Sequence, residues 1–144
     1  MPGKFTDALR AFYPARPRRL PEKEHLRVMS RARIEKVGGL HALYLSGTPY
    51  EMGYQHGVLA RELIRQFRAE AYAYVETLVP IPRFLARPAL FYYASAYWKT
   101  IPEDLREEMK GVADGAGVHP VEVLVATSIW EMLLTSGCSE FAAI

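Results

Sequence analysis

The only cysteine in the sequence, Cys138, directly follows Gly137 and stands six residues before the end of the sequence. A thiol in this position is able to attack the carbonyl before it, and the amine that the cleavage releases then serves as a base for the same thiol. This is the chemistry of an N-terminal nucleophile. Glycine suits the preceding position because it tolerates the strained backbone that exposes its carbonyl to the sulfur. The bond between Gly137 and Cys138 is therefore the candidate self-cleavage site, and Cys138 is the candidate catalytic residue.

A structural interpretation of Cys138 stands beside this one. A lone cysteine among apolar residues is more often a small buried hydrophobe than a nucleophile. One thiol cannot form an internal disulfide, and it offers no pair of cysteines for a metal ion. The sequence therefore predicts a chain stabilised by packing alone, with no metal site and no cofactor.

Charge is unevenly distributed along the 144 residues, half of which are hydrophobic. Residues 1–36 carry ten Lys and Arg against four Asp and Glu, whereas residues 37–144 carry eight against twelve. A basic arm of this kind is able to bind nucleic acid or an acidic membrane surface. It is equally able to lie along the acidic remainder of its own chain, and we favour that interpretation, so no nucleic-acid partner is expected.

Signals for export or membrane insertion are not visible. The first thirty residues lack the apolar core of a signal peptide, and no run reaches the apolar length that spans a bilayer. We therefore expect one compact unit without a membrane span, located in the cytoplasm.

Two strand-like runs, 33–37 and 40–46, are separated only by Gly38 and Gly39. Two glycines between such runs are typical of a tight β-hairpin. A hairpin alone is barely stable, so it is expected to pack on another element.

A helix is predicted to start after Gly47. Thr48 is a suitable N-cap, Pro49 fits the first helical position, and Glu51 completes a capping box. Apolar residues then recur every three or four positions, which predicts one amphipathic helix of about thirty residues over 50–78.

Two glycines, Gly53 and Gly57, lie one turn apart near the start of this helix. Each costs about 1 kcal/mol relative to alanine in a helix, so their expected use is the close approach of another backbone, for example the loop that bears Cys138. His56 lies beside them, and a structural role is favoured over a catalytic one.

Three further helices are expected. One covers 89–99 and is rich in aromatic residues, which either belong to the core or wall an apolar acyl pocket. The next opens at Pro102 and is closed by Gly115 and Gly117. The last starts at His119 and is apolar on most sides, as in a buried helix.

Three segments together carry a resemblance to a known family: 47–57, 107–116, and 137–139 at the candidate cleavage site. Their order and approximate spacing resemble the precursor of fungal acyl-coenzyme A:6-aminopenicillanate acyltransferase and its bacterial relatives, peptidase family C45. The resemblance covers the chain from about Ile34 onward. It implies the N-terminal part of an N-terminal nucleophile (Ntn) hydrolase precursor, with Cys138 as the new N-terminus after self-cleavage.

The implied fold is mainly α, with three to four helices, an N-terminal hairpin and one terminal strand. Residues 1–32 would form the basic arm, 33–137 a helical propeptide-like domain, and 138–144 the first strand of an αββα catalytic sandwich. One strand makes no sandwich and supplies no oxyanion hole, so the segment is expected to be inactive alone.

The implied activity is hydrolysis or transfer of amide or thioester acyl groups. The expected partners are a small-molecule acyl substrate in the longer protein, the rest of the catalytic domain, and possible further copies in a homo-oligomer. A non-catalytic helical interaction module remains the main alternative, followed by a nucleic-acid binder that uses the basic arm.

Overall fold

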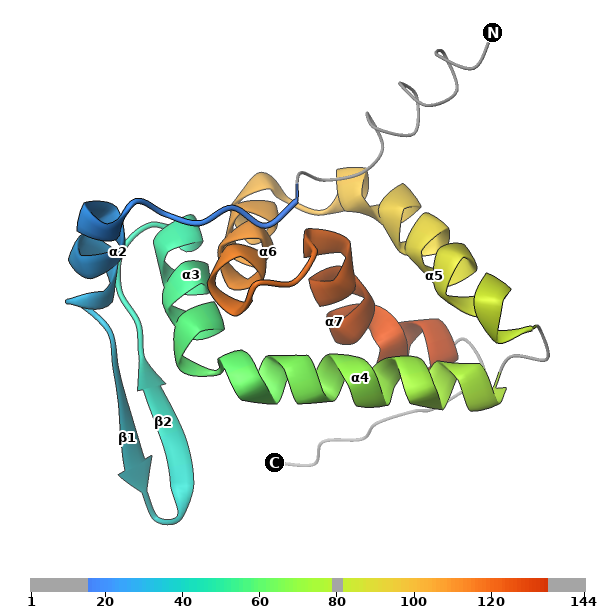
Figure 1. Cartoon of the computed structure of the whole chain (residues 1–144), viewed down its shortest axis with the longest axis horizontal. Coiled ribbons are helices and arrows are strands. Elements are labelled where there is room, and N and C mark those ends of the chain that lie inside the picture. The colour runs from blue at the N-terminus through green and yellow to red at the C-terminus, as the bar shows by residue number, and fades with distance from the viewer. Residues whose placement is uncertain (1–15, 79–81, 135–144) are drawn as a thin grey trace, which may run out of the picture.

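A computed structural model describes residues 16–78 and 82–134 of the chain. This part is mainly helical with one antiparallel hairpin near its N-terminal end (Figure 1), which confirms the predicted fold class. The predicted terminal strand over 138–144 lies outside the described residues. In chain order the elements are α2 (Glu22–Met29), β1 (Arg33–Val37), β2 (Leu40–Tyr44), α3 (Pro49–Leu59), α4 (Arg61–Leu78), α5 (Arg83–Tyr97), a 3-10 turn (Trp98–Thr100), α6 (Glu103–Ala116) and α7 (Pro120–Leu134).

The hairpin forms where the two glycines predicted it. Val37 pairs with Leu40 next to the turn, and the ladder continues to the pair formed by Arg33 and Tyr44. Gly38 and Gly39 have φ angles of 57° and 87°, the left-handed conformations that a two-residue turn of this kind requires.

The capping box at the start of α3 is also present. The Glu51 amide donates to the Thr48 hydroxyl over 3.2 Å, and the Thr48 amide donates to the Glu51 carboxylate over 3.0 Å. Both groups thereby satisfy amides that a helix start leaves unpaired.

The single helix predicted over 50–78 is wrong in one respect, because the chain bends at Ala60 into two helices, α3 and α4. Hydrogen bonding continues through the bend, from Ala60 to His56 and from Ile64 to Ala60, so local sequence alone does not break the helix. Contacts of α4 with the helices that follow set its direction. Arg61 donates to the carbonyl of Gly115 at the end of α6, and Figure 1 shows α4 running beneath α6 and α7.

Helices α3 and α6 cross with their backbones in contact. A Cβ built on Gly53 would collide with the carbonyl of Glu108, and one on Gly57 would collide with that of Val112. The contact is reciprocal, since a Cβ on Gly111 or Gly115 would collide with the backbone of α3. The glycine pair in α3 therefore serves close approach, as expected, but its partner is α6.

The later helices begin and end near their predicted bounds, with two exceptions. Helix α5 begins at Arg83 rather than at residue 89, so Pro88 lies inside it. Gly117, with a φ of 71°, ends α6 as predicted, whereas Gly115 lies inside that helix.

Two clusters of buried apolar side chains among the described residues lie along α6 and α7. One joins α5 and the following turn to α7, and the other joins α6 to the start of α7. The members of the first are Ala94, Trp98, Val121, Leu124 and Val125, and those of the second are Val112, Ala113, Ala116, Val118 and Val123.

Candidate functional site

The two residues predicted to do chemistry, Gly137 and Cys138, lie outside the described residues, so the structure brings no partner to them. No described residue of the aromatic segment 83–99 lines the groove described below, and Ala94 and Trp98 of this segment belong to the core, so its prediction as an acyl-pocket wall stays a prediction. That groove lies elsewhere.

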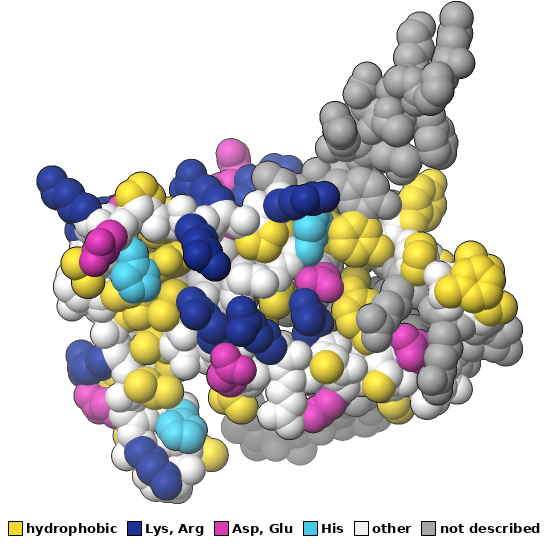
Figure 2. Space-filling model, in the orientation of Figure 1, with side chains coloured by type: hydrophobic (Ala, Val, Ile, Leu, Met, Phe, Trp, Pro, Cys, Tyr) yellow, Lys and Arg dark blue, Asp and Glu magenta, His cyan; other side chains and the backbone are white. Residues whose placement is uncertain are grey.

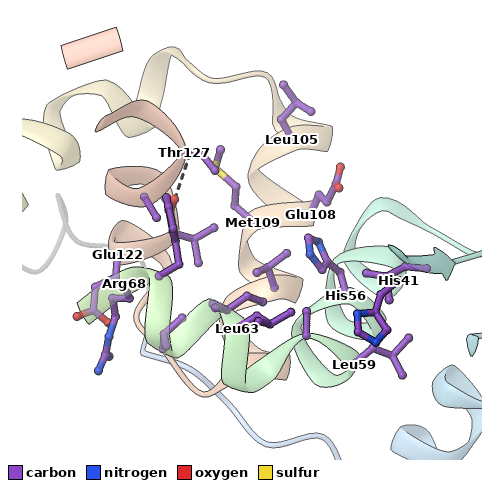
Figure 3. Close-up of a pocket in the computed structure, with 18 of the residues that line it drawn as sticks. His41, His56, Leu59, Leu63, Arg68, Leu105, Glu108, Met109, Glu122 and Thr127 are labelled. Carbon is purple, nitrogen blue, oxygen red and sulfur yellow. Dashed lines mark hydrogen bonds and ion pairs between the residues drawn. The ribbon is translucent and has the colours of Figure 1, made fainter. Parts of the chain in front are cut away.

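This groove has a volume of about 550 Å³ and lies between the hairpin, α3, α4, α6 and α7 (Figure 3). Its volume falls in the range of small-molecule sites, about 300–1,000 Å³. Most of its lining is apolar, as illustrated by Ile34, Leu43, Leu59, Leu63, Met109 and Val123. Because these residues come from all five elements, no single stretch of the sequence predicts the groove.

Polar side chains stand at the two ends of the groove (Figure 3). His41, His56 and Glu108 lie at one end, and Arg68 and Glu122 lie at the other. Neither histidine side chain has a hydrogen bond to another described residue, so a structural role for His56 rests on packing alone within this part of the chain. Histidine side chains serve most often in catalysis as general acids or bases.

At the opposite end of the groove, Arg68 and Glu122 form an ion pair with a structural role. The Arg68 guanidinium lies 3.2 Å from Glu122, and the same carboxylate accepts from the His119 amide over 3.0 Å. Glu122 therefore caps the start of α7 while Arg68 holds α4 against it.

Basic residues of α4 also cover the carboxyl end of α6. Arg61 donates to Gly115 over 2.9 Å and Arg65 donates to Ala116 over 3.1 Å. Helix C-termini leave such carbonyls unpaired, and cations are favourable there. Figure 2 shows one face of the molecule, with Lys and Arg side chains across its middle and acidic side chains among them.

The described part of the basic arm, from Arg16 onward, contacts the crossing helices. The Arg18 amide donates to Asp114 over 2.7 Å, its guanidinium donates to the Tyr50 hydroxyl over 3.3 Å, and that hydroxyl donates to Asp114 over 2.6 Å. Burial and the bond to Asp114 raise the pKa of Tyr50 to about 12. The contacts agree with the interpretation that the arm lies along its own chain.

Helix α2 is fastened by a second set of contacts. Arg27 and Arg31 both lie within 3.0 Å of the Glu51 carboxylate. The bond from the Thr48 amide, helped by the two guanidinium groups, lowers the pKa of Glu51. Several cations of the arm are thus engaged by acidic groups of the helices that follow.

Gln55 is the fully buried polar residue between these parts. Its amide nitrogen donates to the carbonyls of Val28 and Ser46 over 2.9 and 2.8 Å, and its oxygen accepts from the Ser46 amide over 2.9 Å. One side chain therefore joins α2, the segment after β2, and α3. Sequence reasoning missed this residue, because a glutamine within a helix carries no local signal of burial.

Within residues 16–78 and 82–134, no three His, Cys, Asp or Glu side chains are close enough to hold a metal ion together. In those two ranges no helix has both the length and the apolar character of a bilayer span.

No protein-family model matches the chain, and no solved structure matches it significantly. Two curated proteins are similar to it. An uncharacterized protein of Archaeoglobus fulgidus is 39% identical over 86 residues, which cover 54% of this chain and 14% of that protein. Protein dcd1B of Dictyostelium discoideum is 28% identical over 115 residues, which cover 67% of this chain and 23% of that protein. The chain thus spans less than a quarter of the length of either relative.

Proposed function

We propose that this chain is the N-terminal segment of a self-cleaving cysteine Ntn hydrolase or acyltransferase that acts on amide or thioester acyl groups. The supporting observation is the α3–α6 crossing. Two of the three segments that carry the resemblance, 47–57 and 107–116, are packing partners whose glycines meet backbone to backbone. Their joint presence therefore has a physical reason, since either helix alone would gain nothing from its glycines.

The proposed reaction begins within one turn of the chain. The Cys138 thiolate attacks the carbonyl carbon of Gly137, the bond from that carbon to the Cys138 nitrogen breaks, and the nitrogen takes up a proton. The resulting thioester is hydrolysed by water, which leaves a Gly137 carboxylate and a free Cys138 with both thiol and amine. The amine then serves as the base when the thiol attacks an acyl substrate.

The described helices would contribute by holding the segment before the scissile bond. The described part of helix α7 runs from Pro120 to Leu134, and Leu134 precedes Gly137 by three residues in the sequence. Its first half is fixed in the core by Val121 and Val125, both fully buried. Proximity supplies most of the rate of an intramolecular attack, so an anchored approach to the bond favours cleavage.

Mass spectrometry of the protein expressed from its whole reading frame tests this proposal. We expect cleavage between Gly137 and Cys138 without added protease, one uncut chain for Cys138→Ala, and slow cleavage for Cys138→Ser. Uncut wild type that still processes acyl substrates would show that the freed amine is not used. Uncut and inactive wild type would favour the non-catalytic interaction module, for which the open groove is the supporting observation.

A further inference from the structure

The rim of the groove exposes large apolar side chains to solvent. Leu63 is 62% exposed, and Ile34, Phe67 and Leu105 are each more than two-fifths exposed. They come from the hairpin, α4 and α6 and surround a single hollow. A contiguous apolar surface of this kind marks an interaction site more often than scattered exposed residues do.

The hairpin carries apolar residues on both of its faces. Ile34 and Leu43 pair across the ladder on the face that lines the groove. The alternation of a strand places Val37 and Leu40 on the opposite face, and they are 55% and 76% exposed. Strands that are apolar on both faces are typical of sheets covered on both sides.

Among the described residues the hairpin has no further strand beside it. In the described part of the chain β1 and β2 pair only with each other, so the outer edge of each presents unpaired backbone groups. All five residues of β1 are exposed. Two strands are marginal by themselves, and a third strand or a packed layer is what stabilises them.

These features distinguish between possible occupants. A small apolar molecule would fit the hollow of about 550 Å³, but it would leave the opposite face of the hairpin, with Val37 and Leu40, in water. Covering the groove, both faces and the strand edges requires a polypeptide that supplies apolar side chains and backbone hydrogen bonds together.

We propose that the groove and the β1–β2 hairpin are the docking surface for the catalytic part of the same polypeptide, which follows Cys138 in the precursor proposed above. This inference rests on that proposed function. The two curated relatives extend far beyond the matched segment, which is 14% and 23% of their length. A tethered partner also has a high effective concentration, so it docks before any free one.

Hydrogen exchange on the protein from the whole reading frame tests the docking. The variants are Leu40→Asp on the hairpin and Phe67→Asp on the rim. The controls are Leu26→Asp on α2 and Phe84→Asp on α5, which are 60% and 76% exposed and lie outside the groove. We expect amides of β1 and β2 to be protected in wild type and in the controls, and to exchange more than about tenfold faster in the two docking variants.

Three results would overturn the proposal. They are hairpin amides that exchange freely in the wild type, docking variants that behave like the controls, and protection that appears only at concentrations where copies associate. The last result would assign the surface to a second copy. Mass spectrometry of the same samples distinguishes failure of one proposal from failure of the other. An uncut protein with a protected hairpin would refute self-cleavage alone. A cleaved protein with an unprotected hairpin would refute docking alone.

Discussion

The α3–α6 crossing and the β1–β2 hairpin both line the groove, yet they are built in opposite ways. At the crossing, four glycines bring two backbones together, and the residues around them are buried. In the hairpin, two strands pair with each other and expose apolar side chains on both faces. The crossing has its complement within the chain, whereas the hairpin presents a surface without one in the described residues.

The comparison indicates which parts of this segment contribute most to its folding stability. Burial of backbone and core residues stabilises the helices, and the hairpin is attached to them chiefly through the segments around Ser46 and Val28, which Gln55 holds. Substitutions at the crossing should therefore affect folding, and substitutions on the open side should affect association.

The largest effect is expected for Gly57→Ala. The added methyl group would meet the backbone of Val112 and Ala116, which cannot yield without separating the helices, so we expect a loss of about 3 kcal/mol in the free energy of unfolding. Chemical denaturation measures it. Ala73→Gly, at an exposed position of α4, is the control for helix propensity, with an expected cost of about 1 kcal/mol. A Gly57→Ala variant as stable as wild type would contradict the backbone contact.

A smaller loss, about 2 kcal/mol, is expected for Gln55→Leu. The amide and carbonyl of Ser46 would lose their bonds to Gln55, and the Val28 carbonyl would keep only the 3.4 Å bond from the Arg31 amide. The hairpin should also exchange its amide hydrogens faster, since its root is no longer fixed. Gln66→Leu serves as the control, because Gln66 is exposed on α4 and bonds only to Glu70. Equal effects of the two substitutions would argue against a joining role for Gln55.

Removal of the helix cap by Thr48→Ala should cost about 1 kcal/mol, within the range of 0.5–2 kcal/mol found for such caps. Thermal or chemical unfolding checks this value. Thr77→Ala is the matched control, since the Thr77 hydroxyl bonds to a carbonyl within α4 and caps nothing.

A pH titration of unfolding separates Glu51 from the glycine contacts. The pKa of Glu51 lies below its ordinary value of 4.5 in the folded chain, so the folded state prefers the carboxylate. Its contribution is present above pH 4.5 and disappears as the pH falls through the lowered pKa. Because the side chains of Arg27 and Arg31 are about half exposed to solvent, the change should be a fraction of a kcal/mol. Glu51→Gln should remove it, whereas unchanged pH dependence in this variant would contradict the assignment.

The smallest effect on folding is expected on the open side. Leu63→Gln removes an exposed leucine from the groove rim, so the free energy of unfolding of the 144-residue chain should change by less than about 0.5 kcal/mol. Denaturation in parallel with Val121→Ala, a core substitution expected to cost at least about 2 kcal/mol, supplies the contrast. A comparable loss at both positions would mean that the rim is already covered.

Local signals in the sequence predicted the elements well. The Gly38–Gly39 turn, the Thr48 capping box and the Gly117 stop each depend on neighbouring residues only, and each was found. The bend at Ala60 was not predicted, because the apolar period continues through it and the contacts that fix it come from residues more than fifty positions away.

The candidate site was less accessible from the sequence. The partner of Gly53 and Gly57 was predicted as a backbone but not as α6, since a glycine pair one turn apart does not specify what approaches it. The groove was missed because its lining is spread over five elements, and the apolar period of Leu59 and Leu63 is equally typical of a core face. The predictions for Gly137 and Cys138 concern residues outside the described ranges and stay predictions.

The glycine crossing has a further consequence for how α3 and α6 can move. Each missing side chain forms a notch that receives the other backbone, and the notches on both helices are four residues apart. Sliding one helix along the other by a residue would bring a Cβ against a carbonyl, so the pair has one permitted register rather than a range of positions. The crossing therefore fixes the relative positions of α3 and α6. Because α2, α4 and the root of the hairpin contact these two helices, their positions depend on the same register.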